Sequence, residues 1–151
     1  MDGLEEIYQR YQQALAEARN DAAPLAGIFG FAGGPKAHPC HDEFYAAVGQ
    51  WVTDLLSGQP STAELLAAAR FLLSQADSVQ GQDVYWYYLA AQNHAKALIQ
   101  QLDIAACETL RQEYDALYPA AVRLPLHNDI YGLLCQKSDF YPPKKRRFPF
   151  L

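Results

Sequence analysis

Three side chains that commonly bind zinc lie within four residues of one another: His38, Cys40 and His41. Imidazole nitrogen and thiolate sulfur are the usual zinc ligands in proteins. Neighbouring residues rarely reach one ion together, so a site here needs another ligand from elsewhere in the chain. The side chains available for that position are His94, Cys107, His127 and Cys135. A metal-dependent enzyme with zinc at His38, Cys40 and His41 is therefore one alternative.

The same segment suggests a second chemistry, with Cys40 as a nucleophile. Cys40 lies just ahead of a predicted helix, whose positive end favours the thiolate. His38 or His41 is close enough in sequence to serve as the base. No orienting group or oxyanion hole can be identified for this pair. A thiol enzyme with Cys40 and His41 as candidate catalytic residues is thus also kept as an alternative.

These residues belong to a stretch from Gly27 to Tyr45 that contains four glycines and two prolines. Such a composition predicts an irregular connection rather than a helix. A nucleotide-binding P-loop is excluded, because Ala37 stands where that motif has its magnesium-binding hydroxyl. We interpret the stretch first as a structural crossover, with chemistry as the alternative.

The elements on either side of this crossover are predicted to be helices, because apolar residues recur at steps of three and four. The first helix should end at Asn20, Asp21 and Pro24. A capping box at Ser61 and Glu64 and a cap at Asp103 mark two later starts. The helices are expected over residues 3–19, 42–57, 61–76, 82–101 and 103–118, followed by a short one capped by Asn128 or Asp129.

No segment alternates apolar and polar residues as a half-buried strand would. The sequence therefore predicts an all-α fold: a compact bundle of about five or six helices with a Gly-rich crossover between the first and second. A chain of 151 residues fits one domain. We place that helical domain at residues 1–139 and a Pro-rich, basic C-terminal tail at residues 140–151.

Aromatic residues are concentrated at Tyr85-Trp86-Tyr87-Tyr88. At 100° per residue they point in directions spanning about 300°, so one core face cannot bury all four. Tyrosine and tryptophan are frequent anchors of interfaces. One interpretation is that this helix is central to the bundle. The other is that a ligand or partner surface is formed by Tyr85, Trp86 and Tyr87, together with His94, which lies on the same helix side as Tyr87.

Charge is unevenly distributed along the chain. The tail carries Lys144, Lys145, Arg146 and Arg147, and without them the formal net charge of −5 becomes −9. An acidic body argues against nucleic-acid binding except through the tail. The sequence predicts a cytoplasmic protein, because its three cysteines are widely spaced and its N-terminus is acidic. It predicts no membrane span, because no run of about 20 apolar residues is present.

The favoured interpretation is a non-enzymatic binding or protein-interaction module, because no complete catalytic motif is present. Its partner would be another protein or a second copy of the chain. The expected contact residues are Tyr85, Trp86, Tyr87, His94 and the four basic residues 144–147. The metal-dependent or thiol enzyme and nucleic-acid contact through the tail are the alternatives, and no cofactor is expected outside the zinc hypothesis.

Overall fold

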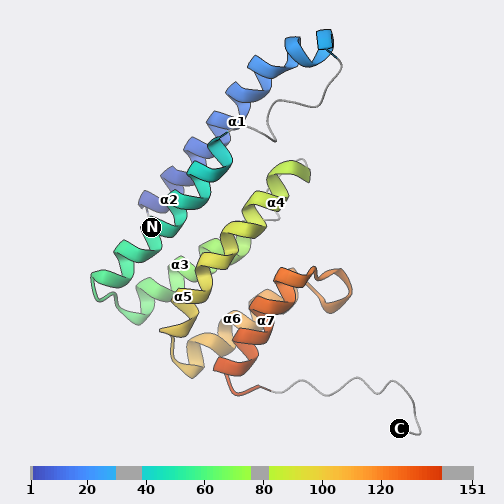
Figure 1. The fold of residues 1–151 in the computed structure, drawn as a ribbon. Coiled ribbons are helices and arrows are strands. Elements are labelled where there is room, and N and C mark those ends of the chain that lie inside the picture. The colour runs from blue at the N-terminus through green and yellow to red at the C-terminus, as the bar shows by residue number, and fades with distance from the viewer. Residues whose placement is uncertain (1, 30–38, 76–81, 141–151) are drawn as a thin grey trace, which may run out of the picture.

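The protein is an all-α bundle in a computed structural model, shown in Figure 1. The structure describes the backbone of residues 2–29, 39–75 and 82–140, and the side chains of residues 3–17, 39–75 and 87–140. The helices are α1 (Asp2–Phe29), α2 (Cys40–Ser57), α3 (Thr62–Ser74), α4 (Gln82–Ala91), η3 (Gln92–His94), α5 (Ala95–Gln100), α6 (Ile104–Leu117), η4 (Ala120–Val122) and α7 (Pro125–Lys137).

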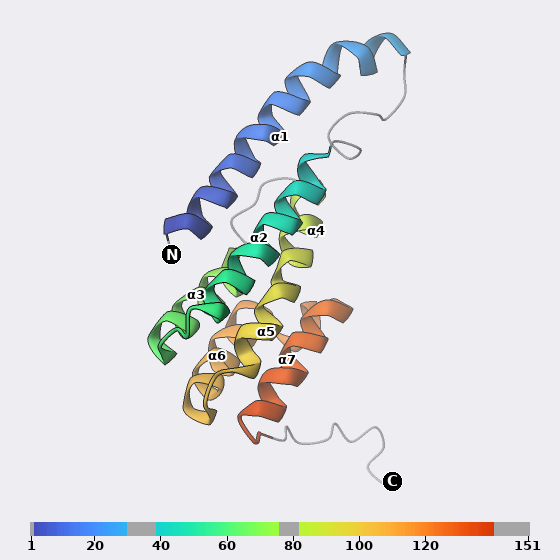
Figure 2. The ribbon, with the colours of Figure 1, turned by 60° about the vertical axis from the view of Figure 1, so that its left-hand side comes forward.

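Helix α1 is longer than predicted, because it continues through Asn20, Asp21 and Pro24 to Phe29. The reason lies in its composition: six of the residues from 14 to 26 are alanine, the strongest helix former. In Figures 1 and 2 its C-terminal half extends beyond α2, which runs beside it in the opposite direction. The expected crossover from Gly27 to Tyr45 is therefore helical at both ends, and residues 30–38 lie outside the described residues.

Two predicted helix caps are present in the structure, and one predicted helix start is displaced. Ser61 and Asp103 cap α3 and α6 as predicted, each accepting a hydrogen bond from a backbone amide in the first turn, at 3.2 and 2.8 Å. Helix α2 begins at Cys40 rather than at Asp42, so Asp42 and Glu43 lie in its first turn, where the helix dipole favours acidic residues.

Helix α7 begins at Pro125, three residues before the predicted cap at Asn128 or Asp129. Proline is well suited to the first helical position, because its missing N–H would have no partner there. His127 completes this start: its Nδ1 accepts the Leu124 amide at 2.9 Å. The predicted start at Asn128 or Asp129 was therefore wrong, because the first turn of α7 is formed by residues 125–128.

Two groups of core side chains combine aromatic rings with buried polar atoms. In the first, Tyr8 on α1 meets the rings of Phe44, Phe71 and Tyr88 edge-on. In the second, Gln92 is fully buried; it accepts a hydrogen bond from Tyr114 and donates to the Leu73 carbonyl. These groups connect α1 to α2, α3 and α4, and η3 to α3 and α6.

The C-terminal end of α7 is closed by a turn through Asp139, whose φ is 56°. The Phe140 amide donates to the Cys135 carbonyl at 2.8 Å, the backbone bond of a Schellman motif. The Phe140 ring lies 3.7 Å from the Arg111 guanidinium. The chain is thus held against α6 at the point where the predicted tail starts. No helix among the described residues is long and apolar enough to cross a membrane.

Candidate functional site

Two of the three residues first singled out for chemistry lie in the opening turn of α2. Cys40 and His41 are both 3% exposed. His38 lies outside the described residues, so the complete trio predicted for zinc is not placed. What the structure does place is the immediate environment of Cys40 and His41, which lies between α1 and α4.

His41 links three helices through its ring. Its Nδ1 lies 2.8 Å from the Tyr11 hydroxyl of α1, with which it forms a buried hydrogen bond. The other contact is a stack on Tyr87 of α4, with centroids 3.8 Å apart and planes at 3°. One ring therefore positions α1, α2 and α4 together, which is a packing role.

The surroundings of Cys40 do not activate its thiol. Burial raises the pKa of Cys40, and the neighbouring Glu43 carboxylate raises it further. A nucleophilic cysteine needs the opposite shift, toward the thiolate. The helix N-terminus proposed to favour the thiolate is present, but burial outweighs it.

The other candidate ligands occupy separate places. His94 donates from Nε2 to the Tyr45 carbonyl at 3.0 Å, and burial lowers its pKa. His127 is fully buried and stacks on Tyr118. Cys107 and Cys135 are buried on α6 and α7. Within the described part of the chain, no three His, Cys, Asp or Glu side chains come together as a metal site.

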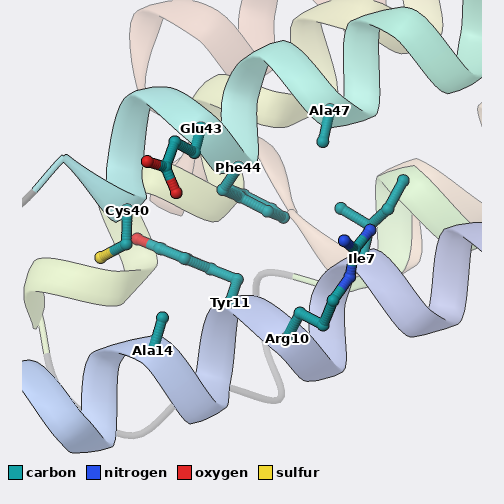
Figure 3. A pocket seen from close by; sticks show the side chains of 8 residues that line it. All are labelled: Ile7, Arg10, Tyr11, Ala14, Cys40, Glu43, Phe44 and Ala47. Atoms are coloured by element: carbon teal, nitrogen blue, oxygen red, sulfur yellow. The ribbon is translucent and has the colours of Figure 1, made fainter.

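A groove of about 230 Å³ runs between α1 and α2, beside Cys40 (Figure 3). Its floor is built on the rings of Tyr11 and Phe44, which stack with centroids 4.1 Å apart and planes at 6°. Small side chains leave the space above this floor open. The lining residues are Ile7, Arg10, Tyr11 and Ala14 from α1 and Cys40, Glu43, Phe44 and Ala47 from α2.

Two exposed charges line this groove from opposite walls, Arg10 on α1 and Glu43 on α2. Figure 3 shows them on either side of the Tyr11 and Phe44 rings. Neither forms an ion pair with any residue that the structure describes, whereas Arg70, Arg111 and Arg123 are paired with Glu113, Glu108 and Asp115. The groove thus has an apolar floor and two unmatched charges of opposite sign.

The predicted binding residues are only partly placed. Of these, Tyr87 is half-buried and its ring stacks on His41. The side chains of Tyr85 and Trp86, and the whole of Lys144, Lys145, Arg146 and Arg147, lie outside the described residues.

The groove was not predicted from the sequence, because nothing there indicates that Arg10 and Glu43 lie on facing walls. The available signal was the pair of small residues, Ala14 and Ala47, on faces otherwise occupied by larger apolar side chains. That signal acquires meaning only once α1 is known to lie against α2.

No protein-family model matches this chain, and neither the curated proteins nor the solved structures contain a match. Its function is therefore argued from the geometry of the α1–α2 groove.

Proposed function

We propose that this protein is a non-enzymatic binding protein that contacts a protein partner through the groove between α1 and α2. The observation that carries the proposal is the pair of unmatched charges, Arg10 and Glu43, beside an apolar floor. Protein interfaces combine an apolar centre with a polar rim in this way. A volume of about 230 Å³ is below the roughly 300–1,000 Å³ typical of small-molecule sites. That size favours side chains of a protein partner over a larger ligand.

The environments of Cys40 and His41 support binding over catalysis. A raised pKa keeps the Cys40 thiol protonated at neutral pH. His41 is buried and engaged by Tyr11 and Tyr87, whereas a general base must reach the proton that it abstracts. The zinc hypothesis, which includes His38, and the nucleic-acid hypothesis for the tail remain predictions.

A substitution that fills the groove tests this proposal. Ala47→Arg places a long side chain over the apolar floor, and Ala116→Arg makes the same change at an exposed alanine of α6. Wild-type protein should either capture a partner from a native lysate or sediment above the monomer mass. Ala47→Arg should lose that association and Ala116→Arg should keep it, with equal thermal melts by circular dichroism. A monomeric wild type that captures nothing beyond what Ala47→Arg captures would contradict the proposal.

A further inference from the structure

The charges of the groove suit a partner that carries the same groove. Around a two-fold axis, residue i of one copy contacts residue j of the other while j contacts i, so the surface must complement itself. Arg10 on one wall and Glu43 on the opposite wall meet this requirement. A partner surface of a single charge sign would repel one of the two.

The levels of the two charges along the helices agree with this arrangement. The Tyr11 and Phe44 ring centroids are 4.1 Å apart, less than one helical turn, so the two residues are taken as one reference level. Arg10 and Glu43 each lie one residue from that level, in opposite directions because α1 and α2 are antiparallel (Figure 2). At 1.5 Å of rise per residue their levels differ by about 3 Å. A two-fold axis parallel to the helices keeps every level unchanged, so it brings Arg10 of each copy opposite Glu43 of the other.

The alternative two-fold axis, across the helices, is disfavoured by the same charges. It would place α1 over α1 and bring Arg10 toward its own equivalent. The parallel axis places α1 over α2 of the other copy, which gives antiparallel neighbours as in a four-helix bundle. Only the parallel axis places the wall that carries Arg10 against the wall that carries Glu43.

Other carboxylates on α1 are too far along the helix to disturb the pair. Among side chains described on its exposed surface, Glu5, Glu6 and Glu17 lie about 10.5, 9 and 7.5 Å from the level of Glu43, at 1.5 Å per residue. Arg10 is closer to that level than any of them. The small side chains of Ala14 and Ala47 leave room for the backbones to approach to the roughly 8–10 Å usual between packed helices.

We infer that the partner is a second copy of this chain, joined through the α1–α2 groove with Arg10 of each copy paired to Glu43 of the other. The inference rests on the proposed function, because it names the occupant of the same groove. The complementary charges and the similar levels of the two residues, about 3 Å apart, carry it.

Charge reversal tests the pairing directly. Arg10→Glu places two carboxylates at each contact, and Glu43→Arg places two cations there. Each variant alone should dimerise roughly tenfold more weakly than wild type or worse, because both symmetric contacts become repulsive. An equimolar mixture of the two variants should restore dimerisation, because every contact between unlike copies again joins a cation and an anion. Sedimentation velocity over a concentration series measures this, and thermal melts confirm that each variant is folded.

The outcomes separate this inference from the proposed function. A wild type that stays monomeric at every concentration overturns the dimer. If that monomer still captures a lysate protein that Ala47→Arg loses, the binding function stands with another partner; if it captures nothing, both fail. A dimer that neither reversal weakens, or one that the mixture does not restore, overturns the pairing of Arg10 with Glu43.

Discussion

Replacing Tyr8 by phenylalanine should make the protein more stable. The Tyr8 side chain is 3% exposed, and its ring meets Phe44, Phe71 and Tyr88 with centroids 4.9, 5.2 and 5.0 Å away. Its hydroxyl has no hydrogen-bond partner among the described residues, and burial raises its pKa. The substitution removes one buried polar atom and keeps the three ring contacts.

The magnitude follows from that single atom. An unsatisfied buried hydroxyl costs about 1–3 kcal/mol, whereas each dispersion contact of the lost oxygen contributes only about 0.1–0.2 kcal/mol. We expect the free energy of unfolding to rise by about 1 kcal/mol, equivalent to about 2–4 °C in Tm for a chain of this size. Tyr11→Phe is the matched control. Its hydroxyl bonds His41 at 2.8 Å, so the same change should lower the free energy of unfolding by about 1 kcal/mol.

Urea unfolding followed by circular dichroism measures both variants against wild type. The reasoning requires opposite signs from two chemically identical substitutions three residues apart on α1. If Tyr8→Phe lost 1 kcal/mol or more (about one net hydrogen bond), the hydroxyl would have a partner in solution and the argument would be refuted. If both variants were more stable than wild type, the hydrogen bond between Tyr11 and His41 would contribute nothing to the free energy of unfolding.

Substitutions at Gly49, Gln92 and His94 test three other contacts of the bundle. A Cβ at Gly49 would lie 2.7 Å from His94 Cε1, so Gly49→Ala should lower the free energy of unfolding by about 1 kcal/mol. In a His94→Ala background the contact is gone, and the same change should raise that free energy by about 0.5–1 kcal/mol. A double-mutant cycle measures the difference. Gln92→Ala removes the acceptor of the Tyr114 hydroxyl bond and one of the donors to the Leu73 carbonyl. It should lower the free energy of unfolding by about 3 kcal/mol in urea unfolding. Burial lowers the pKa of His94, so the unfolded chain protonates first as the pH falls. Stability should decline below about pH 6.5, and urea midpoints across that pH should show a flatter decline for His94→Gln.

Local signals were reliable where one side chain satisfies one backbone group. The caps at Ser61 and Asp103 were predicted because a side-chain oxygen three residues before an amide completes the first turn wherever the helix lies. Local signals failed where a helix-breaking residue lies in a segment rich in strong helix formers. Pro24 was expected to stop α1, yet the helix continues through it, with alanine on its N-terminal side at residues 22 and 23.

The candidate site was less predictable than the fold. Cys40 and His41 were singled out for their types, but their partners, Tyr11 and Tyr87, come from other helices. Arg10 and Glu43 were not predicted to share a site, because each is an ordinary charged residue on a helix surface. Their proximity in one groove depends on the pairing of α1 with α2, which hydrophobic periodicity does not specify.

By itself the sequence determined that the chain is helical, where most helices begin and which faces are apolar, because these follow from spacing and capping within a few residues. The tertiary structure decided which helix lies against which. It placed His41 against Tyr11 and Tyr87 and His94 against Tyr45, and it buried Cys40. It also placed in one groove two opposite charges that form no ion pair within the described part of the chain. Those outcomes depend on contacts between residues about 30 or more positions apart, and no local pattern encodes such contacts.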